Sequence, residues 1–206
     1  MQYKIITLIF LLMVCLSDYS KNTYESNGES DIISVSEDTN MSGCTDSNIT
    51  ENFNRQRAER EEKGYYISTA GNYVGADNER IELVNYYNAT DKTYQEVLNF
   101  LKTDKTDRKE YTDNFQCGDF AELVHNNAEA TGIKCAWVAI DFIDDSDSHA
   151  CNAFNTIDKG LIFIDCVNGD SNVNIENTEK YTPKSLFTAG VQYECLGLVK
   201  HKDIYW

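Results

Sequence analysis

The spacing of apolar residues predicts two helices in the middle of the chain. The first begins at Thr93, which stands three residues before a glutamate as in a capping box, and its apolar positions follow at helical spacing: Tyr94, Val97, Leu98 and Leu101. The second runs from about Cys117 to Ala130, ends before Gly132, and carries a stripe of mostly small side chains: Cys117, Ala121, Val124 and Ala128. Small residues on this stripe would let the helix lie close against a sheet.

Short apolar runs after the second helix predict that sheet. They cover residues 133–142, 149–156 and 161–167. Two turn-forming segments, Asp144–Asp147 and Asp158–Gly160, separate them, and connections this short favour antiparallel neighbours. Residues 168–183 are polar and predict a loop, whereas residues 191–199 and 204–206 predict closing strands.

The segments before the first helix are less regular. Residues 52–63 are highly charged and predict a short solvated helix that ends at Gly64. Residues 65–87 are rich in tyrosine and are expected to pack on the core. We therefore predict a single α+β domain over residues 51–206, in which the helix that begins at Cys117 packs against an antiparallel sheet.

The N-terminal residues predict export. Residues 1–16 contain a lysine followed by an apolar run, which is typical of a signal peptide or an uncleaved membrane anchor. Residues 17–50 are dominated by Ser, Asn, Asp, Glu and Thr, so we expect a disordered polar tether. Cys15 and Cys44 end strings that loosely resemble a lipobox, and lipid attachment at either is left open. A secreted or cell-surface location is expected.

Charge narrows the choice of partner. The formal net charge is −16, which repels polyphosphates and argues against a nucleic-acid partner. We expect contact with a membrane only through the N-terminal segment or a lipid. Nothing in the sequence indicates a cofactor.

Three side chains form a candidate catalytic group. A helix N-terminus lowers the pKa of a thiol, so Cys117 is a candidate nucleophile. His149 begins one predicted strand and Asp165 ends the next, and a hairpin between the strands would place them together. The imidazole would then take the thiol proton, while the carboxylate would hold the ring's other N–H.

Neighbouring polar residues have weaker claims. Gln116 or the backbone N–H of Cys117 could donate to an oxyanion. Cys151 should share a strand face with His149 and would bring a second thiol near the site, which leaves a redox role open. Asn152, on the opposite strand face, and Asp119 are expected to brace the site, although both positions also fit purely structural residues. His125 is expected to be buried and hydrogen-bonded.

Three motifs around the candidate group resemble those of the transglutaminase-like superfamily. Cys117–Ala121 looks like its cysteine motif, Ser148–Asn152 resembles its Gly-His-Ala-Trp-Asn motif, and Ile164–Asp165 is similar to its Ile-Asp-Pro motif. The resemblance implies a papain-like core in a secreted prokaryotic member, with Cys117 as nucleophile, His149 as base and Asp165 as orienting acid. Phe115, Cys151 and Cys166 depart from the family pattern, which usually has Gly, Trp and Pro there.

Three functions are compatible with these residues. The first is a cysteine acyl-transfer enzyme, acting on a peptide or protein that could belong to the cell envelope, with water or an amine resolving the thioester. The second is a catalytically inactive surface module that keeps the fold and binds a partner. The third, a Cys/His metal site, is disfavoured because no Cys-x-x-Cys pair is present. We expect the first, with hydrolysis rather than cross-linking, and no metal.

Overall fold

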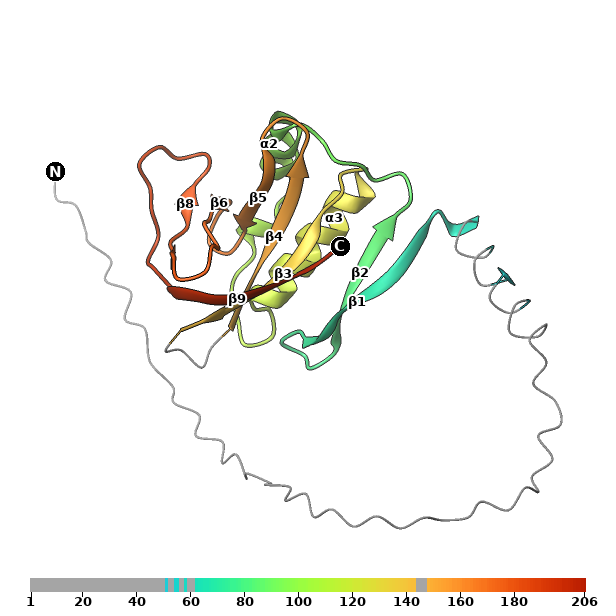
Figure 1. The fold of residues 1–206 in the computed structure, drawn as a ribbon, viewed down its shortest axis with the longest axis horizontal. Helices are drawn as coiled ribbons and strands as arrows, with labels where there is room; N and C mark the ends of the chain where they lie inside the picture. The colour runs from blue at the N-terminus through green and yellow to red at the C-terminus, as the bar shows by residue number, and fades with distance from the viewer. Residues whose placement is uncertain (1–50, 52–53, 56–57, 59–61, 144–147) are drawn as a thin grey trace, which may run out of the picture. The chain divides into compact units, whose positions relative to one another are not determined.

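The computed structural model describes residues 51, 54–55, 58, 62–143 and 148–206 (Figure 1). All of them belong to one unit that spans Cys44–Trp206. The predicted leader and tether, residues 1–16 and 17–50, lie outside the described residues. Between residues 51 and 63 the described residues are helical and exposed, as predicted for the short charged helix.

The fold is α+β, with a large antiparallel sheet in the order β7-β9-β3-β4-β5-β6-β8. Its central strands are β3 (Ala136–Phe142), β4 (Ser148–Thr156), β5 (Gly160–Asp165) and β9 (Gly197–Tyr205). The shorter strands are β6 (Ser171–Asn172), β7 (Lys180–Tyr181) and β8 (Lys184–Ser185). Every pairing in this sheet is antiparallel, as the short connections predicted.

Both predicted helices are confirmed. Helix α2 (Tyr94–Thr103) begins with the expected capping box, in which the Thr93 hydroxyl accepts from the backbone N–H of Glu96. Helix α3 (Cys117–Ala130) begins at the cysteine, and a short 3-10 helix, η1 (Thr106–Arg108), lies between the two. Helices α2 and α3 bury an apolar cluster against the sheet that includes Val97, Leu101, Val124, Phe154 and Ile164.

The tyrosine-rich segment forms a separate two-stranded hairpin of β1 (Tyr65–Val74) and β2 (Arg80–Tyr86). Figure 1 shows α3 between this hairpin and the large sheet. Three side chains of α3 accept from successive outward N–H groups of β2: Glu122, Asn126 and Glu129 bond Glu82, Val84 and Tyr86. The helix thereby takes the place of a third strand along β2, because residues 3 or 4 apart on a helix face alternate residues on a strand.

The predictions for the C-terminal segment were correct only in part. Residues 168–183 were predicted to be a loop, but they contain β6 and β7 and cover the sheet face opposite α3. Their apolar residues Val173, Ile175 and Tyr181 are buried there with residues of β3 and β9. The polarity of the segment conceals this, because single buried side chains alternate with exposed ones and the strands are only two residues long.

The closing strands also differ from the prediction. Residues 191–199 and 204–206 were expected to be two strands, but β9 is one continuous strand that includes the polar residues 200–203. That stretch can remain in the sheet because one strand face is open to solvent. Gly197, where β9 begins, lies so close to the ring of Phe142 that a Cβ would stand 3.0 Å from it.

Candidate active site

Cys117 is the first residue of α3 and is half-buried. The turn into the helix is fixed by Asp119, whose carboxylate accepts from the backbone N–H of Gln116 at 2.8 Å. The N–H groups of a first helical turn have no partner within the helix, so they create a positive potential around the Cys117 sulfur.

His149 and Asp165 lie side by side, as the hairpin predicted. The His149 Nε2 atom is 2.9 Å from Asp165 Oδ2, and the two side chains are 10% and 3% exposed. Ile164 pairs with Asn152, so Asp165 lies on the opposite strand face from Ile164 and reaches His149 diagonally across the sheet. Because Nε2 is engaged with the carboxylate, Nδ1 is the ring nitrogen left for the thiol.

The electrostatics favour an ion pair between Cys117 and His149. Burial acts to raise the pKa of the Cys117 thiol, but the hydrogen bond with His149, the imidazolium charge and backbone N–H groups outweigh it, and the pKa is lowered. Burial acts to lower the pKa of His149, yet the charge and hydrogen bond of Asp165, with those of Cys117, raise it to about 10. Both shifts favour the thiolate–imidazolium form of the pair over the neutral form.

The sulfur faces a cleft of about 250 Å³. One wall is the end of β1 and the turn that follows, residues 73–76, and the opposite wall is the start of β4, residues 148–150. The start of α3 and Trp137 complete the lining, whereas Asp165 lies behind His149 and does not reach the cleft. A ligand in the cleft could therefore reach Cys117 but not the Asp165 carboxylate.

Asp119 also fixes the hairpin wall of this cleft. Its two carboxylate oxygens accept from the backbone N–H of Ala76 at 3.3 and 3.2 Å. A Cβ at Gly75 would collide with the same carboxylate, so only glycine lets the turn approach this closely. The sequence-based expectation that Asp119 braces the site agrees with these contacts.

Gln116, the tentative oxyanion donor, lines the cleft next to Cys117. Its side-chain amide donates to the backbone carbonyl of Asp113 at 3.4 Å. That contact is long, and the amide can turn toward a ligand in the cleft without breaking a strong bond.

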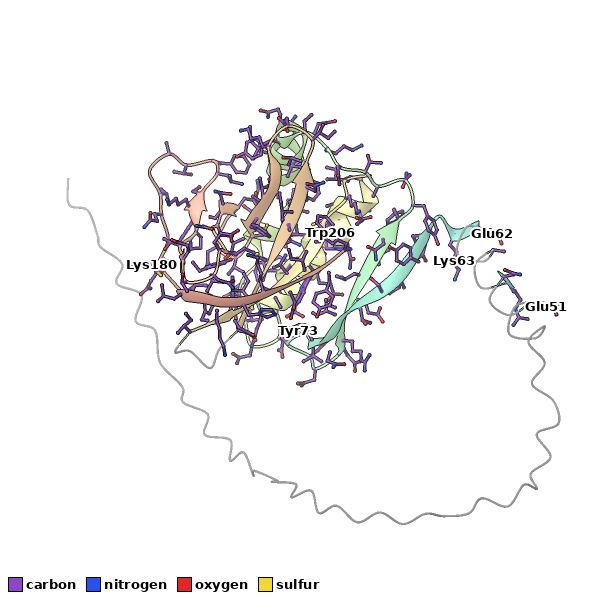
Figure 2. All side chains as sticks on the ribbon, in the orientation of Figure 1. Glu51, Glu62, Lys63, Tyr73, Lys180 and Trp206 are labelled. Atoms are coloured by element: carbon purple, nitrogen blue, oxygen red, sulfur yellow. The ribbon has the colours of Figure 1, made fainter. Side chains whose placement is uncertain are left out.

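Aromatic residues that the sequence analysis did not single out complete the cleft. The Trp137 indole N–H donates to the carbonyl of Gly118 at 3.0 Å, which ties β3 to the start of α3. Tyr73 packs against Trp137 with ring centroids 5.2 Å apart, and its hydroxyl donates to Asp203 of β9. Figure 2 labels Tyr73 near the end of β1, where the hairpin approaches β9. Trp137 thus provides an aromatic wall of the cleft from β3.

Tyr181 is a third residue that sequence reasoning missed. It is fully buried, and its hydroxyl donates to Asp165 Oδ2 at 2.8 Å. Its ring lies edge-on to that of His149, with centroids 5.2 Å apart. The only local signal was an aromatic residue two positions before Pro183, the single proline of the chain, which does not identify a site residue.

The remaining polar residues have structural positions. The Asn152 amide donates to Ala121 O of α3 at 2.8 Å and to Ala136 O of β3 at 3.3 Å, so it joins the helix to the sheet as expected. His125 is buried, as expected, and burial lowers its pKa to about 4. Neither of its ring nitrogens has a partner in hydrogen-bond geometry, so the expected hydrogen bond is not found.

The described cysteines are free thiols: Cys117, Cys135, Cys151, Cys166 and Cys195. Cys151 is buried beside Tyr181, and burial with the charge of Asp165 raises its pKa well above the ordinary value. A thiol held protonated is a poor partner for redox exchange, which argues against the redox role left open above.

The described residues contain no group of three or more His, Cys, Asp or Glu side chains arranged to hold a metal ion. Over the same part of the chain, no helix has the length and apolar character needed to cross a bilayer.

Comparison with known proteins adds no relative. No protein-family model matches the chain, and neither the curated proteins nor the solved structures gave a match.

Proposed function

We propose that this protein is a cysteine acyl-transfer enzyme that hydrolyses an amide or peptide bond through a thioester on Cys117. The proposal rests on one observation: a hydrogen-bonded chain runs from Cys117 through His149 to Asp165, with only the thiol end open to the cleft. A nucleophile, a base and a group that orients the base are the three parts that covalent acyl transfer needs.

The chemistry follows from the ion pair. The Cys117 thiolate attacks the carbonyl carbon of the substrate, and the C–N bond breaks as the His149 imidazolium gives its proton to the leaving amine. Neutral His149 then takes a proton from water, whose oxygen attacks the thioester and releases the acid and the thiol. Hydrolysis needs no acceptor other than water, which can enter the open cleft.

The developing oxyanion has two donors within reach. The backbone N–H of Cys117 belongs to the first turn of α3, and the Gln116 amide stands next to it in the cleft. The N–H group is fixed before the reaction and can stabilise a tetrahedral intermediate without reorganisation, whereas the Gln116 amide must turn from Asp113 toward the cleft.

We also propose a papain-like core of the transglutaminase-like type. The cysteine-bearing helix against an antiparallel sheet, with histidine and aspartate on adjacent strands, supports this proposal along with the three sequence motifs. The apolar leader in residues 1–16 supports a secreted or cell-surface location, where a peptide or protein would be the substrate.

Iodoacetamide alkylation over a range of pH, with each labelled cysteine identified by mass spectrometry, tests the proposal. Cys117 should react at a pH well below that at which exposed Cys195 reacts, because the thiolate is the nucleophile. His149→Ala should abolish this advantage. His201→Ala is the matched control, because His201 also contacts an aspartate, Asp203 at 3.1 Å, but on the exposed part of β9.

Peptide hydrolysis by wild type and Cys117→Ala then tests turnover. Cleavage that depends on Cys117 supports the hydrolase, whereas transfer of an added primary amine to the substrate would identify cross-linking instead. If Cys117 reacts no faster than Cys195 at neutral pH, the enzyme proposal fails and the inactive binding module becomes the better account.

A further inference from the structure

The geometry points to Tyr181 as a positioning residue that acts through Asp165: we infer that its hydroxyl, by donating to that carboxylate, moderates the ion pair between His149 and Cys117. This inference rests on the proposed function. It adds a fourth side chain to the group, one that comes from the C-terminal segment rather than from the sequence motifs.

The contacts of Asp165 define this role. Its Oδ1 accepts from the backbone N–H of Val167 at 2.8 Å, and its Oδ2 accepts both from the Tyr181 hydroxyl at 2.8 Å and from His149 at 2.9 Å. The carboxylate therefore cannot rotate without losing a bond on each oxygen. The edge-on ring of Tyr181 also limits rotation of the His149 imidazole.

The direction of the Tyr181 hydroxyl is determined by its partners. An ionised carboxylate only accepts, so the hydroxyl must donate to Asp165. Cys151 lies within hydrogen-bonding reach of the same hydroxyl. Burial and the charge of Asp165 raise the pKa of Tyr181 well above its ordinary value, so the hydroxyl stays protonated at any pH at which the site would work.

Tyr181 and His149 both donate to Asp165 Oδ2, so each weakens the hydrogen bond of the other. The hydroxyl proton places positive charge beside Oδ2, which weakens the attraction between the carboxylate and the imidazolium. Without the hydroxyl, Asp165 would stabilise the imidazolium more strongly and Cys117 would ionise at lower pH. An imidazolium held more firmly is also a weaker acid toward the leaving amine.

The fold brings Tyr181 to this place through β7. Tyr181 pairs with Gly197 at the start of β9, and its carbonyl accepts from the N–H of Leu196 at 3.0 Å. Its ring also packs on Phe142, with centroids 5.7 Å apart. The backbone of β7 is thus fixed independently of the hydroxyl, so removal of the hydroxyl should leave the fold intact.

The test compares the pH dependence of Cys117 alkylation in wild type and Tyr181→Phe. Loss of one hydrogen bond to the carboxylate should move the midpoint of the Cys117 profile about 0.5 to 1 pH unit lower. Tyr193→Phe removes a hydroxyl from the same segment, outside the site, and should leave the midpoint where it is in wild type. Nitrogen NMR shifts of His149 in both proteins report its protonation directly.

The outcomes separate this inference from the proposed function. If wild-type Cys117 shows no early ionisation, the proposed function fails. If it does, and the Tyr181→Phe midpoint stays within 0.2 pH units of wild type or moves higher, the role of Tyr181 is refuted. If Tyr181→Phe does not fold, a site-specific fluorotyrosine at position 181 replaces it, because its hydroxyl is a stronger hydrogen-bond donor. The midpoint of the Cys117 alkylation profile should then move to higher pH. An unchanged midpoint would equally refute the role.

Discussion

Replacing Asp165 with asparagine should reverse the hydrogen bond that orients His149. Asparagine that keeps the side-chain position must place an amide N–H₂ either toward His149 and Tyr181 or toward the N–H of Val167. In the first case the amide donates to Nε2, and the ring then carries its proton on Nδ1, where it cannot accept from the thiol. In the second case two donors, the amide and the Val167 N–H, face each other.

The magnitude follows from the pKa values. Asp165 is the main cause that raises the pKa of His149 to about 10 against the effect of burial. Without that charge the pKa should fall to its ordinary value of 6.5 or lower, and the difference corresponds to about 5 kcal/mol of ion-pair stability. Cys117 would lose much of the imidazolium charge that lowers its pKa, so the pKa should rise and a smaller share of the thiol would be ionised at pH 7.

The expected result is therefore slower alkylation of Cys117 at pH 7, with a pH profile whose midpoint lies higher than in wild type. Asp158→Asn, which alters an exposed aspartate that accepts from the N–H of Tyr94 and does not line the cleft, serves as the matched control and should leave the rate unchanged. Cys195 reports any general change in reactivity within each sample. A folded Asp165→Asn protein whose Cys117 reacts within threefold of the wild-type rate would refute the reasoning.

Two further predictions concern stability. Gly75→Ala should lower the free energy of unfolding by about 1–3 kcal/mol, because the new Cβ collides with the Asp119 carboxylate. Gly118→Ala is the control and should be neutral or stabilising, since its Cβ would meet Ile81 at 3.6 Å and alanine favours a helix. Thermal unfolding of both variants measures the difference, and equal unfolding midpoints would contradict the collision. Burial lowers the pKa of His125 in the folded protein from 6.5 to about 4, so its contribution to the free energy of unfolding is present above pH 6.5 and lost as the pH falls toward 4. Urea unfolding should show that the free energy of unfolding falls by about 3 kcal/mol more in wild type than in His125→Leu over that range. Equal losses would show that His125 is not buried in neutral form.

Local sequence signals predicted the elements that contain the three candidate residues. The Thr93 capping box and the spacing after Cys117 depend on residues three or four apart, and both helices begin where those signals stand. The hairpin signal between His149 and Asp165 likewise spans only a few residues, and it placed both side chains on one sheet face. These predictions succeeded because each depends on contacts that are short in sequence.

The features that were missed depend on contacts between distant residues. Tyr181 is 16 residues from Asp165, as His149 is, but no hairpin signal links Tyr181 to Asp165, and β7 exists only because it pairs with β9. Trp137 becomes part of the cleft only when the β1 hairpin, more than 60 residues earlier in the chain, packs beside it. No periodicity in either segment carries that information, because partner strands are not specified by the pattern of one strand.

The energetic cost of the buried group favours a catalytic function over an inactive binding module. Moving the charges of His149 and Asp165 out of water is unfavourable, and apolar side chains of similar volume would serve the fold at least as well. The structure nevertheless surrounds Asp165 with three donors while it leaves the Cys117 sulfur open to the cleft. A surface that only binds has no use for a thiolate held in this way. Enhanced reactivity of Cys117 in wild type, and its loss in Asp165→Asn, would therefore show that the buried His149–Asp165 pair activates the Cys117 thiol.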